Sequence, residues 1–249
     1  MNFSKNVNKI NELVGLDANE DGQEDDLVAS NLFIGESIGT VYGYELDGFY
    51  QIGDERPAAY PVGSPRIVDR NDDGELSPED RVILGREEPA FRFSLFNSLA
   101  YKNLTLNVLI NSIQGGKDGY MGANMPPGSI LASVPDNPTR YNFYKEFDFW
   151  TPSNPDADYR HPFSSGGIEP IIYADRSFVR LQDISLKYNF NPNFLNNLNI
   201  EDLSVYVSGK NLATWTKWVG WDPETGQGIN PNGAMPVLKS YSLGLNITF

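Results

Sequence analysis

The residues best suited to chemistry in this sequence form an acidic loop between positions 69 and 80. Oxygen-bearing side chains recur at alternate positions, and Gly74 follows the third of them. This is the spacing of an EF-hand loop, in which alternate residues turn their oxygens towards one Ca²⁺ and the glycine allows a sharp turn. The candidate ligands are Asp69, Asn71, Asp73, Glu75, Ser77 and Asp80. Because Asp80 is shorter than the glutamate usual at the twelfth position, we expect a weak, structural Ca²⁺ site. The alternative is a solvated acidic turn.

A second acidic stretch begins the same pattern without completing it. Its first residues are Asp17, Asn19, Asp21 and Gly22. The twelfth position is Val28, so a solvated turn is favoured there.

No catalytic motif is visible elsewhere, whether a nucleophile elbow, a zinc-protease helix or a phosphate-binding glycine loop. The single histidine, His161, is expected to be an ordinary residue of a loop rich in proline and serine. The sequence therefore predicts a protein that is not an enzyme.

Three of the four tryptophans cluster at the end of one predicted strand, at positions 215, 218 and 221. Such rings can belong to the aromatic girdle that membrane barrels place at the lipid–water interface. They can also stack on sugar rings or on peptide side chains. We favour the girdle for Trp215 and Trp218. Trp221 lies past the strand in a loop, which makes it the candidate substrate-contacting residue.

The elements that would position these residues are β-strands. From Tyr241 to Phe249, five large apolar side chains alternate with small or polar ones. A period of two places all five on one face of a strand. Similar alternation marks segments 91–99, 104–110, 184–190 and 203–207. A break in phase at 178–181 predicts a β-bulge. Segments 3–13 and 38–46 are weaker strand candidates.

The connections between these strands alternate in length. The links near 101–103 and 191–201 are short. The long ones, rich in Gly and Pro, are 47–88, 114–176 and 218–237. Long irregular loops are unusual inside a compact soluble domain. They are expected in outer-membrane barrels, which have short periplasmic turns and long extracellular loops. The three long connections are therefore predicted to be extracellular, and by the same count 15–33 falls on the periplasmic side.

Composition excludes several classes of protein. The 249-residue chain has no cysteine, so it has neither disulfides nor thiolate metal sites. A net charge of -14 repels nucleic acid. No stretch approaches the roughly 18 apolar residues of a membrane-spanning helix, and the first residues lack the apolar region of a signal peptide. Barrel strands, with about ten alternating residues each, remain compatible. A β-sandwich or lectin-like jelly roll would show the same alternation.

Six groups of residues sharpen this interpretation. They are 38–44 with 47–50, 69–74 through 80–85, 150–152 with 154–155, 175–181, 205–212 and 220–224. Their sequences and order resemble the SusC/RagA family of TonB-dependent outer-membrane transporters of Bacteroidetes. The resemblance spans residues 34–249.

The resemblance implies an all-β chain, with residues 1–249 forming the C-terminal section of an antiparallel transmembrane barrel of about 22 strands with long extracellular loops. It implies import of glycans or peptides across the Gram-negative outer membrane, powered by TonB and aided by a SusD-type surface lipoprotein. The visible strands are too few and odd in number, so the plug domain and the N-terminal strands are expected to lie outside this chain. In the family, an aromatic residue on the last strand is an assembly signal, a role that falls to Tyr241 and Phe249. The alternative function is a soluble, calcium-dependent, carbohydrate-binding β-sandwich.

Overall fold

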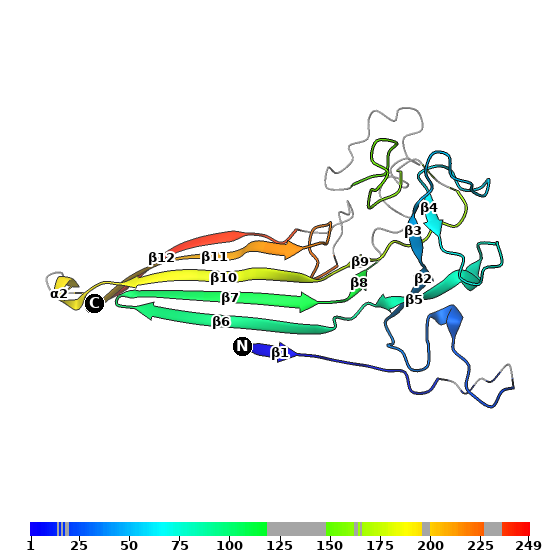
Figure 1. The fold of residues 1–249 in the computed structure, drawn as a ribbon. Coiled ribbons are helices and arrows are strands. Elements are labelled where there is room, and N and C mark those ends of the chain that lie inside the picture. The colour runs from blue at the N-terminus through cyan, green and yellow to red at the C-terminus, as the bar shows by residue number, and fades with distance from the viewer. Residues whose placement is uncertain are drawn as a thin grey trace, which may run out of the picture.

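The computed structural model describes the whole chain except residues 14, 16, 18, 19, 119–147, 162, 163, 165, 196–199 and 227–235. Its main feature is a six-stranded antiparallel sheet with the order β1-β6-β7-β10-β11-β12 (Figure 1). The strands are β1 (Asn2–Ser4), β6 (Phe91–Tyr101), β7 (Leu104–Gln114), β10 (Phe178–Asn189), β11 (Asp202–Thr216) and β12 (Ser240–Thr248). The five predicted strand segments all lie in this sheet. Among the described residues, no helix is long and apolar enough to cross a membrane.

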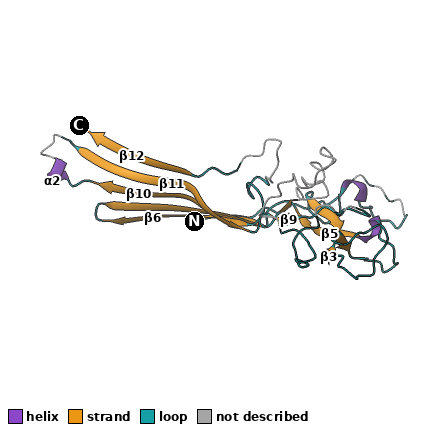
Figure 2. Cartoon of the chain, turned by 90° about the horizontal axis from the view of Figure 1, so that it is seen from above, coloured by secondary structure: helices purple, strands orange, loops and turns teal. Residues whose placement is uncertain are grey.

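The sheet is open and forms a single layer (Figure 2). β12 pairs with a neighbour on one side only. β1 is so short that it covers only residues 92–94 of β6. Two strand edges therefore present backbone N–H and C=O groups without a ladder partner among the described residues. Such edges are templates for pairing with further strands.

The two faces of the sheet differ in chemistry. Residues paired across antiparallel strands point to the same face, so each register row can be assigned to one side. One row is Leu99, Leu106, Leu186, Val207 and Leu243. The adjacent row, on the opposite face, is Ser98, Asn107, Ser185, Ser208 and Ser242. We call these the apolar face and the polar face. Phe96 and Leu109 are apolar exceptions on the polar face.

The predicted β-bulge is confirmed in β10. The register shifts between Leu181 and Asp183, so Gln182 is an extra residue relative to β7. On the other side, β11 accommodates the shift near Asn211, which has a left-handed φ of 52°. A bulge reverses the alternation of the strand beyond it. As a result Arg180, which would otherwise face the apolar side, lies on the polar face beside Asn111.

The connections confirm part of the predicted alternation. At one end of the sheet, β6 and β7 are joined by a tight turn at residues 102 and 103, and β10 and β11 by a short link containing α2 (Pro192–Leu195). Three long excursions, 5–90, 115–177 and 217–239, leave and re-enter the sheet at the opposite end (Figure 1). We call their packed part the loop body.

Both weaker strand predictions were wrong in extent or place. Segment 3–13 is a strand only at its start, in β1. Segment 38–46 contains β2 (Thr40–Tyr44), but this strand pairs with β5 (Arg81–Arg86) inside the loop body. The main sheet therefore has one strand fewer than the sequence suggested. For the same reason residues 15–33 belong to the first long excursion, and their assignment to the short-turn end was wrong.

The loop body has its own small sheets and core. Besides β2–β5, β3 (Leu46–Phe49) pairs with β4 (Pro65–Ile67), and β8 (Lys117–Asp118) pairs with β9 (Ala174–Asp175). Two 3-10 turns, η1 (Val28–Ser30) and η2 (Pro78–Asp80), complete it. Trp150 is buried against Phe49, Ala157 and Val62, and its indole N–H donates to Gln51 at 2.9 Å. Thus residues 47–62 and 148–157 form one packed unit.

Candidate functional site

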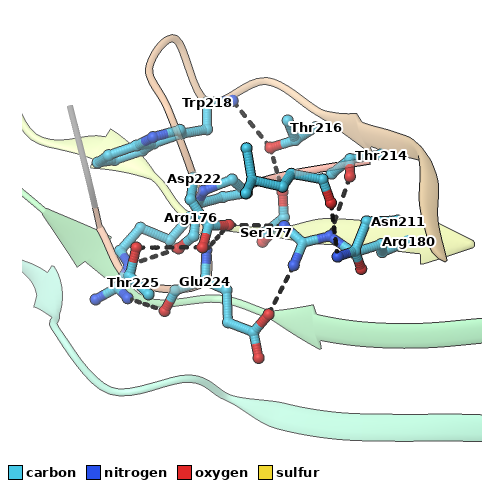
Figure 3. A network of polar contacts seen from close by, with 12 residues as sticks. Arg176, Ser177, Arg180, Asn211, Thr214, Thr216, Trp218, Asp222, Glu224 and Thr225 are labelled. Atoms are coloured by element: carbon cyan, nitrogen blue, oxygen red, sulfur yellow. Dashed lines mark hydrogen bonds and ion pairs between the residues drawn. The ribbon is translucent and has the colours of Figure 1, made fainter. Parts of the chain in front are cut away.

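A buried arginine organises the polar face near the loop body (Figure 3). Arg180 of β10 is only 3% exposed. Its two terminal nitrogens donate to Asp222 Oδ1 and Glu224 Oε2, each at 2.7 Å. Its Nε donates to the Thr214 hydroxyl at 3.0 Å, and its guanidinium carbon lies 4.7 Å from the centre of the Phe178 ring. A charge removed from water is tolerated when it is paired and hydrogen-bonded, and each of the three nitrogens of this guanidinium donates to an oxygen.

Arg176 holds the backbone of the same segment. Its Nε donates to the carbonyl of Pro223 at 3.0 Å and its Nη2 to the carbonyl of Glu224 at 2.6 Å. Asp222 adds local contacts, accepting from the Glu224 N–H at 3.1 Å and from the Thr225 hydroxyl at 3.2 Å. Two arginines four residues apart therefore fasten residues 222–225 to the end of β10.

Glu224 also borders a hollow of about 200 Å³ on the polar face. The hollow is lined by Asn2, Ser4, Arg92, Phe93, Ser94, Asn111, Ile113 and Glu224. These residues come from three adjacent strands and from the segment after β11. The segment thus folds over the polar face rather than away from it. The two arginines belong to the sequence motif 175–181, and Asp222 and Glu224 belong to the motif 220–224. Nothing in the spacing of these motifs indicated that they pair.

The acidic loop at 69–80 does fold back on itself. Asp69 Oδ2 accepts from the Gly74 N–H at 2.8 Å, Asn71 Oδ1 from the Asp73 N–H at 3.2 Å, and Asp73 Oδ1 from the Glu75 N–H at 2.7 Å. Gly74 supplies the turn with a φ of 80°. Asp69 Oδ1 is enclosed and accepts no hydrogen bond from the described residues. Three of the six candidate ligands are thus gathered in one turn.

The remaining candidates serve other roles in this conformation. Asp80 is fully buried, and its carboxylate accepts the backbone N–H groups of Arg70 and Ser77, each at 2.8 Å. The Ser77 hydroxyl accepts from the Glu79 N–H, which caps η2. The hydrogen bonds from Ser77 and Arg70 lower the pKa of Asp80, against the opposing effect of burial. Glu75 is exposed.

Within the described residues, no group of three or more His, Cys, Asp or Glu side chains is placed to hold a metal ion. The oxygen donors of residues 69–73 still match Ca²⁺ in chemistry, because hard cations prefer carboxylate and amide oxygens. Calcium binding here stays a prediction. In the second acidic stretch, Asp17 accepts from the backbone of Asp21 and Gly22, while Asn19 lies outside the described residues.

The aromatic candidates fall into different environments. Trp215 lies on the apolar face in register with Val179 and is exposed, as the girdle hypothesis requires. Trp218 is only 5% exposed, so its assignment to the girdle was wrong: it turns inward after β11, where its backbone N–H donates to Thr216. Trp221 is 37% exposed in the loop. Tyr241 and Phe249 are exposed. The structure brings none of these five into the acidic loop.

His161 belongs to the loop body, as expected. Its ring meets Trp150 edge-on, with 6.1 Å between ring centres. Burial lowers the pKa of His161, so the neutral imidazole is favoured at neutral pH. Gly63 packs against the Trp150 ring and the His161 Cβ, and a Cβ on residue 63 would lie 2.5 Å from Trp150. The histidine is thus a packing residue of this unit.

The chain resembles known proteins in sequence and in structure. No family model matches the chain. It is 30% identical over its whole length to TonB-dependent receptor P3 of Formosa agariphila, and 30% identical over 99% of its length to TonB-dependent receptor P26 of the same organism. The chain spans only 26% of each of these relatives.

Solved structures agree on the fold. The chain is 21% identical to a chain of the RagAB peptide transporter, with a TM-score of 0.61 over 87% of this chain and 23% of that one. The RagAB peptide importer in the open-open state gives 20% identity and a TM-score of 0.57, covering 87% of this chain and 24% of the other. An all-β, antiparallel section of a barrel is the shared architecture.

Proposed function

This chain is related to the SusC/RagA-like TonB-dependent transporters, and we propose that it forms a section of such a transporter's barrel in the bacterial outer membrane. The observation that carries the proposal is the two-faced open sheet. Leu243 is 79% exposed and Val207 50% exposed on the apolar face, in register rows that cross five strands. An apolar surface of this extent is unfavourable in water, and in membrane barrels the apolar side of the strands is buried against lipid.

The polar face and the open edges fit the same assignment. In a transport barrel the residues that alternate with the lipid-facing ones line a polar lumen. The free edges of β12 and β6 would pair with strands of the remainder of the transporter, since a closed barrel leaves no edge. The three long excursions would be extracellular and the short links periplasmic. The order of the sequence motifs supports a C-terminal position for this section.

The other function considered, a soluble carbohydrate-binding β-sandwich, fits poorly. A sandwich buries the apolar side of one sheet against a second sheet about 10 Å away. Among the residues that the structure describes, the six-stranded sheet has no such partner. The distinguishing observation is solubility: a sandwich would be a stable monomer in buffer, whereas this chain should require detergent or the rest of its barrel.

We propose that the whole transporter imports peptides or glycans with a surface lipoprotein and TonB as partners. The named activity of the RagAB neighbour, peptide import, supports the peptide alternative. The half-exposed Trp221 is the candidate ring for contact with the imported molecule. We propose no enzymatic step for this chain.

Gene deletion tests the import proposal. Loss of the transporter should abolish growth on its own substrate class, either a peptide mixture or a polysaccharide as sole carbon source, and loss of TonB should have the same effect. An affinity tag on the transporter should recover the lipoprotein from outer membranes. Unchanged growth on every peptide and polysaccharide tried, with no lipoprotein recovered, would contradict the proposal.

For the acidic loop we propose a structural Ca²⁺ site in the extracellular part of the transporter. The enclosed Asp69 Oδ1, for which the described part of the chain offers no hydrogen-bond donor, is the feature that favours an ion. A cation there would offset the repulsion between Asp69, Asp73 and Glu75 and stiffen the loop.

A further inference from the structure

We infer that Arg176 and Arg180 form a latch that fixes residues 221–226 over the polar face and thereby makes Glu224 part of the lumen wall. The placement over the polar face follows from the contacts in Figure 3. That the polar face lines a lumen rests on the proposed function. The latch itself does not, because its contacts lie entirely within this chain.

Arg180 is the fixed half of the latch. The bulge at Gln182 turns its side chain to the polar face, where it is almost completely buried. Lys210, on the same face of β11, is exposed and makes no ion pair with any residue that the structure describes. A buried guanidinium loses its hydration, so releasing Asp222 and Glu224 would leave an uncompensated charge, which is strongly unfavourable. The ion pairs therefore act to hold the segment down.

Arg176 is the half that acts on the backbone. It binds two successive carbonyl oxygens, of Pro223 and Glu224, and so fixes the path of the chain independently of their side chains. The segment then closes at Gly226, which has a φ of 68° and packs against Arg176 and Asp118. A Cβ at Gly226 would lie 2.5 Å from the Asp118 carboxylate. Only glycine combines a readily adopted positive φ with the absence of a Cβ that would clash with Asp118.

The consequence is the placement of a carboxylate. Glu224 gives one oxygen to Arg180 and borders the hollow that Arg92, Ser94 and Asn111 also line. Arg92 is exposed. A solute in this hollow would meet a hydrogen-bond acceptor and a guanidinium donor together. Without the latch, the wall here would consist of the strands alone. Arg176 and Arg180 are thus positioning residues for Glu224.

Protease protection tests the latch. A glutamate-specific endoprotease cleaves after Glu224, and the carbonyl of that bond is the one that Arg176 binds at 2.6 Å. The whole transporter, purified in detergent, would be digested and the peptide ending at Glu224 followed by mass spectrometry. We expect Arg176→Gln and Arg180→Met to accelerate this cleavage by roughly tenfold or more, because local opening exposes the bond. Arg180→Lys should give an intermediate rate, since an ammonium cannot match the fork of a guanidinium.

Lys210→Met is the matched control, and its cleavage rate should equal that of the wild type. Folded barrel in each variant would be verified by its resistance to denaturation in unheated detergent. Arg176 lies before β10 with its side chain 23% exposed, so Arg176→Gln keeps the test decisive if Arg180→Met does not fold. Wild-type cleavage rates in a folded arginine variant would overturn the latch. Failure of the wild-type transporter to reach the outer membrane would instead contradict the proposed function.

Discussion

Replacing Leu243 with arginine is the sharpest perturbation of the two-faced sheet. Leu243 lies on the apolar face of β12, one residue from the middle of a strand of nine residues. Nine residues at about 3.4 Å each extend roughly 30 Å, and a tilt of about 40° reduces the height to near the ~25 Å apolar band of outer-membrane barrels. Leu243 should therefore lie close to the midplane of the bilayer.

At that depth an arginine on the lipid side costs about 2–4 kcal/mol. Since about 1.4 kcal/mol is a factor of ten, the ratio of folded to unfolded transporter should fall roughly 30- to 700-fold. The matched controls are Ser242→Arg and Asn246→Arg, which place the same charge on the polar face of the same strand. The assay is denaturant unfolding of the transporter in lipid vesicles. Equal costs on both faces would refute the assignment of the apolar face to lipid.

Three further outcomes are expected. Deleting Phe249 should lower the yield of folded transporter in the outer membrane, because the exposed last strand would lose its assembly signal; an unchanged yield would count against this. Millimolar Ca²⁺ should protect residues 69–80 from proteases with an affinity on the order of 10⁻⁴–10⁻³ M, and the Asp69→Ala, Asp73→Ala double variant should lose the effect. If wild type and variant are equally sensitive in Ca²⁺ and in chelator, the loop is only an acidic turn. Asp80→Asn should loosen the loop body at neutral pH: a carboxylate whose pKa lies below its ordinary 3.8 stabilises the fold above that value and loses this effect as pH falls through the lowered pKa. Wild-type hydrogen exchange in residues 69–80 of the variant at neutral pH would contradict that role.

Alternation was a sound guide to the main sheet because each of its long strands has one mainly apolar side. Five segments, from 91–99 to 241–249, were placed correctly, and so was the bulge near 178–181. A bulge leaves a readable trace in sequence, since it inserts one residue into a period of two.

Segment 38–46 shows why the same signal failed elsewhere. This segment does form a strand, β2, but its Val41 is buried in the loop body, and the strand pairs with β5 rather than with a strand of the main sheet. Alternation reports that one side of a strand is buried and says nothing of which strand it pairs with. Counting this segment as a strand of the main sheet placed residues 15–33 at the wrong end of that sheet.

The Arg180 cluster could not be predicted from the sequence for a related reason. Its two carboxylate partners lie 42 and 44 residues further along the chain, beyond an intervening strand. Spacing of this kind carries no local signal, whereas the acidic loop does, because all its candidate ligands fall within the short stretch 69–80. An arginine at the predicted bulge, Arg180, was the available hint.

Contact between lipid and the apolar face is the most direct test of a membrane barrel. A single added tryptophan at position 243 or at position 242 would be compared in the whole transporter, reconstituted with lipids that carry bromine on their acyl chains. Bromine quenches the fluorescence of a tryptophan that touches the acyl chains. The fluorescence of the tryptophan in Leu243→Trp should therefore be strongly quenched and that in Ser242→Trp should not, because the two side chains point to opposite faces of β12. Equal quenching at the two positions, or none at either, would contradict the account.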